Sequence, residues 1–519
     1  MSQVKKSSRL NEGSEHSQPT GSLLVSSPEP TLEAHRQTQD PSPAAAAAQS
    51  SPEEPRSFFW SIGGLGVSAA RAKIVLKLAW PVMVGMVTQT AVNLVDTAMI
   101  GRLPGDVSIP GHAALGLSLP LYWAIGGFLA SIQIGTQAIV ARRYGEGKKK
   151  LAGQALMNSL LIGITTAIFV SVAAVLLVPA IFPFFHSDPD VIRWGVPYLQ
   201  IRLVATTAMV GTLSIKGFFD AIGRTYVHMI VALVMNVLNI FGNWVLIFGN
   251  LGAPRMMVSG AALASASSTV IGLLLMIAWT MHSRVQADYI PYRLANRSKE
   301  VLWNIVRISV PSGIATVAMM SGFLLFMKIG AGLDEVAGHG AVYTASIKVV
   351  IDIMSLTFMT CLAFGTATAT LVGQSLGRGK PRRAELFGWE SMKMAAYVFT
   401  IVGVITLLWP ELFLGIFSKD AQVIEAARPV LRLIACVQGL IAAALILMQA
   451  NFGAGNSKFV MKVELFLHFL CMIPLAYGLG IAADLGLLGM WLSVVVYVVL
   501  LTLVLGYKFH QGKWKESRV

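Results

Sequence analysis

One acidic residue, Asp96, lies inside a long apolar stretch, VNLVDTAMIG. A charge at the centre of a bilayer costs at least ~2.5–3.5 kcal/mol, so a carboxylate in such a stretch needs a chemical reason. Asn239 and Asn243 lie four residues apart in another apolar stretch, so their amides share a helix face. With the Ser265 hydroxyl, these oxygens suit Na⁺, and a desolvated carboxylate equally suits a proton. We predict a cation site, with Asp96, Asn239 and Asn243 as metal ligands if the ion is Na⁺.

The same residues have simpler interpretations. A carboxylate near a helix end can lie at the membrane interface, and buried Asn or Ser side chains often only hold helices together. Pro81, fifteen residues before Asp96, removes a backbone hydrogen bond and predicts a hinge. Lys348 and Asp352 are spaced to neutralise one another, which favours a structural pair over substrate contact. Possible cavity-lining residues are Gln133, Gln137, Arg202, Lys348, Asp352 and Gln438.

The composition indicates a membrane protein. Of 519 residues, 55% are hydrophobic and only 13% are charged, about half the charged fraction of a soluble protein. A helix crossing the hydrocarbon core needs about 20 apolar residues. Twelve stretches qualify, which predicts twelve transmembrane helices and argues against a soluble enzyme. They are 76–100, 113–141, 154–180, 192–215, 225–249, 257–281, 304–331, 341–374, 388–410, 424–450, 459–482 and 485–508.

The distribution of charge predicts the orientation. The net charge of +14 could indicate a nucleic-acid partner, but Lys and Arg gather in the connections after even-numbered spans and in the tail. Cytoplasmic loops of membrane proteins carry such an excess. We therefore expect a multi-pass protein of a cell (inner) membrane, with both termini in the cytoplasm and no nucleic-acid partner. The basic connections contain Arg142, Arg143, Lys148, Lys149, Lys150, Arg284, Arg293, Arg297, Lys299, Arg378, Lys380, Arg382 and Arg383.

An internal repeat divides the chain into two halves. AIVARRYGEGK matches TLVGQSLGRGK, with Gly145 and Gly377 232 residues apart, and FDAIGRT matches NFGAGNS at the same offset. Pro81 and Pro311 match at an offset of 230. We expect two pseudo-symmetric six-helix lobes around a central cavity, an arrangement found in transporters, although a channel or scaffold could share it. The predicted units are a disordered extension (1–56), an N-lobe (57–283), a linker (284–300), a C-lobe (301–510) and a basic tail (511–519).

Signals for enzymatic chemistry are missing from the sequence. No GxxxxGK[ST] segment occurs, so ATP is not supported as the direct energy source, and the nine histidines show no metal-ligand spacing. We expect no catalytic residues and no cofactor beyond a transported ion. The expected partners are the lipid bilayer and a small drug-like molecule, with the protein acting as a monomer.

The motifs, taken in order, resemble the multidrug and toxic compound extrusion (MATE) family over about residues 75–505. The resemblance rests on the Pro81/Asp96 pair, NLVDTAMIGRL, the duplicated loop, FFDAIGRT and the run from LNIFGNWVLIFG to SGAALASAS. It implies a transporter that exports organic cations and amphipathic compounds in exchange for Na⁺ or H⁺ by alternating access. It also implies cation-coupling roles for Asp96, Asn239, Asn243 and Ser265.

The C-lobe departs from the pattern of NorM-type members. Met319 stands where those members have a Glu, and Ile441 stands where they have an Asp, while Gln438 is retained. We therefore expect ion coupling in the N-lobe. The alternative function is a lipid-linked oligosaccharide flippase of the same superfamily, which would need several basic residues in its cavity.

Overall fold

The computed structural model describes residues 66–185, 188–338 and 342–516. The chain divides into the units 1–56 and 57–519, and the described residues all belong to the second. The extension predicted for 1–56 lies outside them, as do the last three residues of the predicted tail. Within the described ranges the regular structure is helical throughout, without a strand.

Twelve helices of the described part are long and apolar enough to cross a membrane, which confirms the predicted number of spans. Most of the helices extend somewhat beyond the ends predicted from hydropathy, whereas α8 and α9 match their predicted ranges to within one residue at each end. Those of the N-lobe are α3 (Ala69–Ile100), α4 (Gly105–Ala130) continued by α5 (Ile132–Gly145), α6 (Lys149–Phe185), α7 (Pro189–Ala221), α8 (Tyr226–Phe248) and α9 (Met257–Met281).

The C-lobe has the corresponding set of spans. They are α11 (Lys299–Ala337), α12 (Val342–Gly377), α13 (Pro381–Leu408), α15 (Ala421–Gly453), α18 (Gly486–Gln511), and α16 (Ser457–Phe466) continued by η3 (Leu467–Met472), α17 (Ile473–Tyr477) and η4 (Gly478–Ala482). The segments η3 and η4 are π-helical. Shorter elements in the connections are η1 (Asn250–Gly252), α10 (Ser283–Tyr289), η2 (Leu294–Asn296), α14 (Pro410–Phe417) and η5 (Lys513–Glu516).

Polar residues at the helix starts explain several of these boundaries. The Asp420 side chain accepts hydrogen bonds from the main-chain nitrogens of Gln422 and Val423 at the start of α15. Ser298 accepts one from the nitrogen of Val301 at the start of α11. Such caps satisfy main-chain donors that the first helical turn leaves free.

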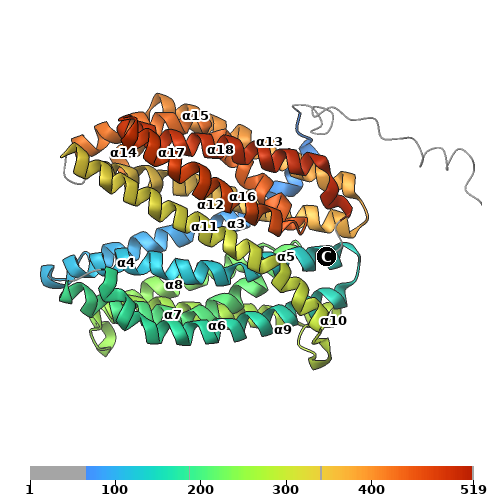
Figure 1. Ribbon diagram of the computed structural model, residues 1–519. Coiled ribbons are helices and arrows are strands. Elements are labelled where there is room, and N and C mark those ends of the chain that lie inside the picture. Colours follow the sequence, from blue (N-terminus) through green and yellow to red (C-terminus); the bar gives the residue numbers. More distant parts are fainter. Residues whose placement is uncertain (1–65, 186–187, 339–341, 517–519) are drawn as a thin grey trace, which may run out of the picture. The chain divides into compact units, whose positions relative to one another are not determined.

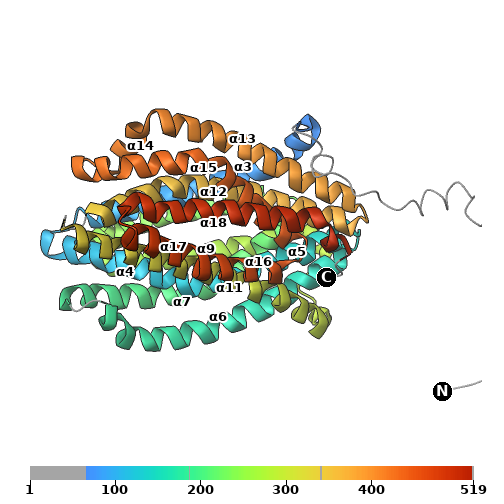
Figure 2. The ribbon, with the colours of Figure 1, turned by 45° about the horizontal axis from the view of Figure 1, so that its top comes forward.

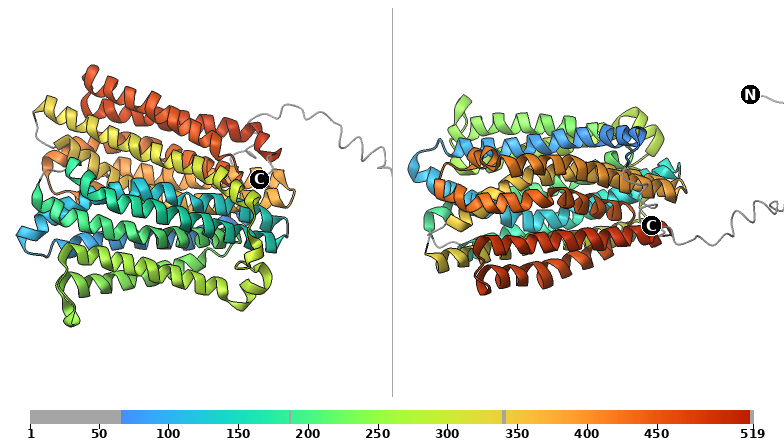
Figure 3. Two further views of the ribbon diagram at one scale, coloured as in Figure 1. Left: turned by 60° about the horizontal axis from the view of Figure 1, so that its bottom comes forward. Right: turned by 90° about the horizontal axis from the view of Figure 1, so that it is seen from above.

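Large apolar side chains are exposed on the outer helices. Phe169 and Leu176 on α6 are 72% and 73% exposed. A soluble monomer rarely presents a continuous apolar surface of this kind, so these side chains fit contact with lipid. In Figures 1, 2 and 3 the long helices run in nearly the same direction, as a bundle crossing a bilayer requires.

The first helix of each lobe contacts both lobes. α3 packs on α8 of its own lobe and on α12 of the C-lobe, while α11 packs on α16 and on α5 of the N-lobe. Figure 1 shows the yellow-to-red helices of the C-lobe stacked on the cyan-to-green helices of the N-lobe. A change in the shape of α3 would therefore alter its packing against both lobes.

Candidate functional site

The predicted site residues of α3 and α8 lie in direct contact. Asp96 is four residues from the end of α3, and the Asn243 amide Nδ2 donates to Asp96 Oδ1 at 2.5 Å. Asn239 lies one turn earlier on the same face of α8, with its side-chain amide 3.2 Å from Asn243 Nδ2. The four-residue spacing of the two asparagines thus turns both amides toward the same carboxylate.

Ser265 joins the group from α9. Its Oγ lies 2.8 Å from the Asn239 amide. The amide fits its surroundings best with Nδ2 turned toward Asp96, where it lies 3.0 Å from Asp96 Oδ1 and the amide oxygen accepts from Ser265 Oγ. Three helices of the N-lobe therefore supply a carboxylate, two amides and a hydroxyl to one cluster.

The cluster is largely buried and contains an amide oxygen that could bind a ligand. Asn239, Asn243 and Ser265 are buried, and Asp96 is half-buried. Among the described residues no hydrogen bond reaches the buried Asn243 Oδ1, although buried polar atoms are normally paired. That oxygen could accept a bond from a protonated Asp96, or it could coordinate a cation together with the carboxylate.

A fixed positive charge acts on the same carboxylate. Arg202 on α7 places its guanidinium over the Tyr122 ring, 4.7 Å from the ring centroid, and attracts Asp96 electrostatically. Its Nε has no hydrogen-bond partner among the described residues. An arriving cation must therefore compete with Arg202 for the charge of Asp96.

The predicted hinge residue, Pro81, is buried inside α3, which is one helix from Ala69 to Ile100. Its ring leaves one main-chain carbonyl of α3 without its usual helical donor. The proline therefore lies in the one helix that carries Asp96 and contacts α12 of the other lobe.

The remaining predicted cavity residues make contacts that do not include Asp96. Lys348 and Asp352 form an ion pair on α12, with Nζ 2.6 Å from Oδ2. Gln438 on α15 is buried and donates to Thr357 Oγ1 at 2.6 Å, and Gln133 is half-buried on α5.

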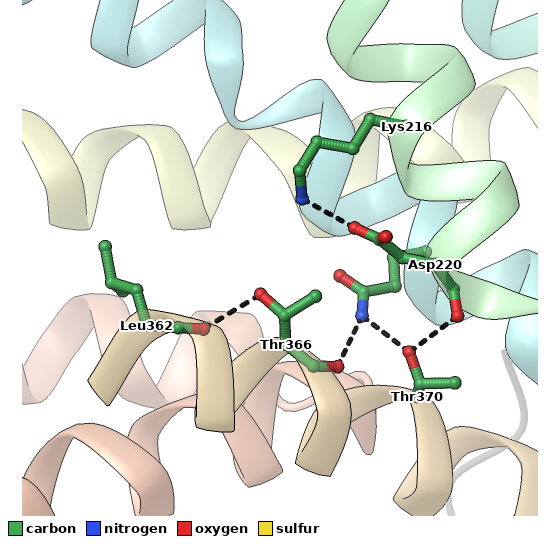
Figure 4. Close-up of polar contacts among 6 residues, drawn as sticks. Lys216, Asp220, Leu362, Thr366 and Thr370 are labelled. Atoms are coloured by element: carbon green, nitrogen blue, oxygen red, sulfur yellow. Dashed lines mark hydrogen bonds and ion pairs between the residues drawn. The ribbon is translucent and has the colours of Figure 1, made fainter. Parts of the chain in front are cut away.

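Gln137 takes part in a polar contact between the lobes. Its Nε2 donates to the main-chain oxygen of Thr366 at 2.8 Å and to Thr370 Oγ1 at 2.9 Å, both on α12. Thr370 Oγ1 in turn donates to the main-chain oxygen of Asp220 at 3.1 Å. Figure 4 shows Thr366 and Thr370 of α12 beside Asp220 of α7.

A buried ion pair shares Asp220 with this contact. It was not predicted from the sequence. Lys216 Nζ lies 2.6 Å from Asp220 Oδ2, and the two side chains are only 4% and 0% exposed; Figure 4 shows Lys216 pointing at Asp220. Asp220 Oδ1 has no partner among the described residues. The four-residue spacing was the available signal, but spacing alone does not show burial.

The duplicated glycines of the repeat face one another in the same region. A Cβ on Gly145 would lie 2.2 Å from the main-chain oxygen of Gln374, and one on Gly377 would lie 2.1 Å from that of Arg142. The lobes thus touch through main chain at the end of the bundle that carries the basic connections, which we call the basic end.

The connections at the basic end shift the pKa values of nearby side chains. Partial burial opposes ionisation of Glu146, but Lys148 and Arg143, each with a nitrogen 3.1 Å away, outweigh it and hold its pKa below the ordinary value. Burial raises the pKa of Tyr289 to about 12. Burial also raises the pKa of Tyr292.

Fold and site together define a helical, multi-pass membrane protein of two related lobes, with a polar cluster suited to a cation in one of them. A profile of the MatE family matches residues 81–245 and 311–478, one block in each lobe. The chain belongs to the MatE family, which confirms the resemblance seen in the motifs.

Relatives match along nearly their whole length. "Probable multidrug resistance protein NorM" of Thermotoga maritima is 27% identical over 456 residues, covering 86% of this chain and 94% of the relative. "Multidrug resistance protein PmpM" of Pseudomonas aeruginosa is 28% identical over 443 residues, covering 82% and 88%.

Solved structures share the fold at lower identity. A MOP superfamily transporter from Pyrococcus furiosus is 20% identical, with a TM-score of 0.76 and coverage of 89% of this chain and 99% of that one. A structure described as MATE in the bent conformation gives a TM-score of 0.77, at 20% identity and coverage of 89% and 98%.

Proposed function

We propose that this chain is a secondary antiporter that exports organic, cationic or amphipathic compounds in exchange for H⁺ or Na⁺. Two relatives that match this chain over nearly their full length are named as multidrug resistance proteins, which supports the export of drug-like compounds. The observation that carries the coupling is the contact of Asp96 with Asn243 at 2.5 Å, beside Asn239 and Ser265. The basic connections support a cell (inner) membrane location with cytoplasmic termini.

Coupling follows from where Asp96 lies. Binding of a cation neutralises the carboxylate, which weakens its attraction to Arg202 and changes the preferred packing of α3. Because α3 contacts α8 and α12, this change favours one arrangement of the lobes over the other, with Pro81 giving α3 a point at which to bend. The ion drives transport only if it binds the two arrangements with different affinities.

Two ions fit the donor set. A proton would bind Asp96 directly and could be shared with the unpaired Asn243 Oδ1. Sodium would use the Asp96 carboxylate together with the amide and hydroxyl oxygens, since hard cations favour oxygen ligands. In either case the ion and a cationic cargo compete for the same negative charge, so cargo leaves when the ion binds.

The test is efflux from proteoliposomes under a proton gradient and a sodium gradient imposed separately, with ethidium as cargo. One gradient should drive efflux by the wild-type protein, and Asp96→Asn should abolish that efflux while the protein remains folded and inserted. Asp106→Asn is the matched control, because Asp106 is exposed in the first turn of α4. Wild-type efflux from Asp96→Asn would contradict the proposal.

A further inference from the structure

The C-lobe contains a buried cluster of titratable side chains that is separate from the Asp96 site of the N-lobe. His468 Nδ1 lies 3.0 Å from Glu464 Oε2, and the Tyr497 hydroxyl donates to the same carboxylate oxygen at 3.0 Å. The rings of His468 and Tyr497 are 4.6 Å apart. Glu464 and His468 are both buried, in a segment that hydropathy assigns to the membrane.

The contacts fix where one proton of the cluster resides. His468 Nδ1 is also 3.0 Å from the main-chain oxygen of Glu464. Both of its neighbours only accept, so Nδ1 must carry a hydrogen. With Tyr497 donating as well, the ionised Glu464 is satisfied in the low-dielectric interior, and His468 Nε2 can take one further proton.

The internal repeat relates this cluster to the Asp96 site. Gly260 and Gly489 hold equivalent places, since a Cβ would lie 2.7 Å from the main-chain oxygen of Leu246 and 2.5 Å from that of Leu479, respectively. Tyr497 comes eight residues after Gly489, which matches Ser268 after Gly260. Ser268 is three residues beyond Ser265 on α9.

The fifth helices of the two lobes also show that this cluster corresponds to the neighbourhood of the Asp96 site. His468 comes eleven residues after Ser457, which matches Asn236 after Thr225, the pair aligned in the repeat. Asn236 lies one turn before Asn239 on α8. The C-lobe cluster therefore uses the counterparts of α8 and α9, one turn nearer the basic end than the Asp96 site.

The helix geometry also changes beside these residues. η3, which contains His468, is π-helical, and such segments often mark functional sites inside α-helices. Gly322 of α11 provides the space for the ring, because a Cβ there would lie 2.6 Å from His468 Cδ2. α11 is the counterpart of α3, so the first, fifth and sixth helices of the C-lobe all meet at this cluster.

Several basic groups on the surrounding elements are exposed or make contacts elsewhere. Lys328 of α11 and Lys462 of α16 are exposed, and the Lys508 ammonium of α18 lies over the Phe459 ring, 5.1 Å from its centroid. Cys471 of η3 is half-buried. In the half of α15 nearer the basic end, after Arg432, Cys436 is the sole titratable residue.

We propose that Glu464, His468 and Tyr497 form a second proton-binding site and that the ion at Asp96 is likewise a proton, so that the transporter exchanges cargo for one proton in each lobe. The proposal rests on the proposed antiport function. It uses neither Met319 nor Ile441, which stand where NorM-type members have a Glu and an Asp. A carboxylate, an imidazole and a phenol suit a proton better than Na⁺, which favours oxygen ligands alone.

The experiment counts the protons released when ethidium binds to the purified, detergent-solubilised full chain, by calorimetry in buffers of different ionisation enthalpy. Wild type should release two protons per ethidium, Asp96→Asn one, Glu464→Gln one, and the double variant none. Glu464→Gln keeps an oxygen that accepts from His468 and Tyr497, so the fold should persist. Glu385→Gln removes another buried carboxylate, paired with Arg382 and Lys515, and should leave two protons.

The outcomes separate the two proposals. Release of equal numbers of protons by wild type and Glu464→Gln, with a loss only in Asp96→Asn, would overturn the second site and leave the antiporter intact. No release by wild type, together with no gradient-driven efflux, would overturn the antiporter itself. If Glu464→Gln fails to fold, His468→Gln, which retains a donor toward Glu464, should show the same loss of one proton, and an unchanged count would reject the site.

Discussion

Gly145 and Gly377, 232 residues apart in the sequence, lie against each other where the two lobes meet: a Cβ on Gly377 would be 3.0 Å from the Cα of Gly145. They are equivalent residues of the internal repeat, so each lobe contributes the same point of its chain to the contact. The absence of side chains allows the main chains to approach this closely. The hydrogen bond from Gln374 Nε2 to the main-chain oxygen of Ala221 at 2.7 Å lies in the same contact.

Gly145→Ala should open the lobes at the basic end. The added Cβ would lie 2.2 Å from the main-chain oxygen of Gln374, and overpacking of this kind costs about 1–3 kcal/mol. In a chain whose three cysteines are replaced by Ser, a cysteine introduced at the buried Ser375 should react faster with a water-soluble maleimide. Gly116→Ala is the control, because a Cβ there meets no atom within 4 Å. Equal labelling rates in both variants would refute the prediction.

Removing one charge of the Lys216–Asp220 ion pair should destabilise the protein strongly, whereas replacing both residues with apolar ones should not. Lys216→Met leaves a buried carboxylate uncompensated, which costs about 3–5 kcal/mol of unfolding free energy. Met448 and Phe452 occupy the equivalent positions of the C-lobe, so Lys216→Met combined with Asp220→Phe should recover most of that loss. Denaturant unfolding of the detergent-solubilised variants measures both values. A double variant less stable than Lys216→Met would show that the charges themselves hold the lobe together.

The sequence predicted the twelve spans because each is strongly apolar and holds few charges over a length that only a bilayer demands. It could not separate two pairs with identical spacing. Lys216–Asp220 is 4% and 0% exposed, whereas Lys348–Asp352 is 61% and 36% exposed. The difference arises because α12, about 150 residues farther along the chain, covers the first pair.

The candidate site could be predicted only in part, because the sequence shows which residues share a helix face but not which helices pack together. Spacing placed Asn239 and Asn243 on one face, but only the packing of α3 on α8 brings Asp96 to that face. Gln137, predicted as a possible cavity-lining residue, donates hydrogen bonds to Thr366 and Thr370 in the contact between the lobes, which its sequence position did not indicate. Polar residues inside spans can be recognised from sequence, while their partners depend on helix packing.

Asn243→Leu should reduce ion-driven efflux at least tenfold with little loss of stability. The substitution removes the donor 2.5 Å from Asp96 Oδ1, so the carboxylate loses a bond that holds it toward α8, and a factor of ten corresponds to about 1.4 kcal/mol. Initial rates of ethidium efflux from proteoliposomes provide the measurement. Asn451→Leu is the control, because buried Asn451 donates to the main-chain oxygen of Leu447 in its own helix. Similar rates in both variants would contradict a role for Asn243 beyond packing.

Glu146 should contribute a pH-dependent term to stability. Its pKa is lowered in the folded protein by Lys148 and Arg143, against the effect of partial burial. Its contribution is therefore present above the unfolded pKa, about 4.3, and is lost as the pH falls through the lower folded pKa. Because Lys148 is 57% exposed, solvent screening limits the effect to below about 1 kcal/mol. Glu146→Gln should thus unfold at a lower temperature than wild type at pH 7, with the gap closing toward pH 3, while Glu335→Gln, an exposed site, should show no such trend. A gap that widened on acidification would mean that burial, and not the two cations, dominates at Glu146.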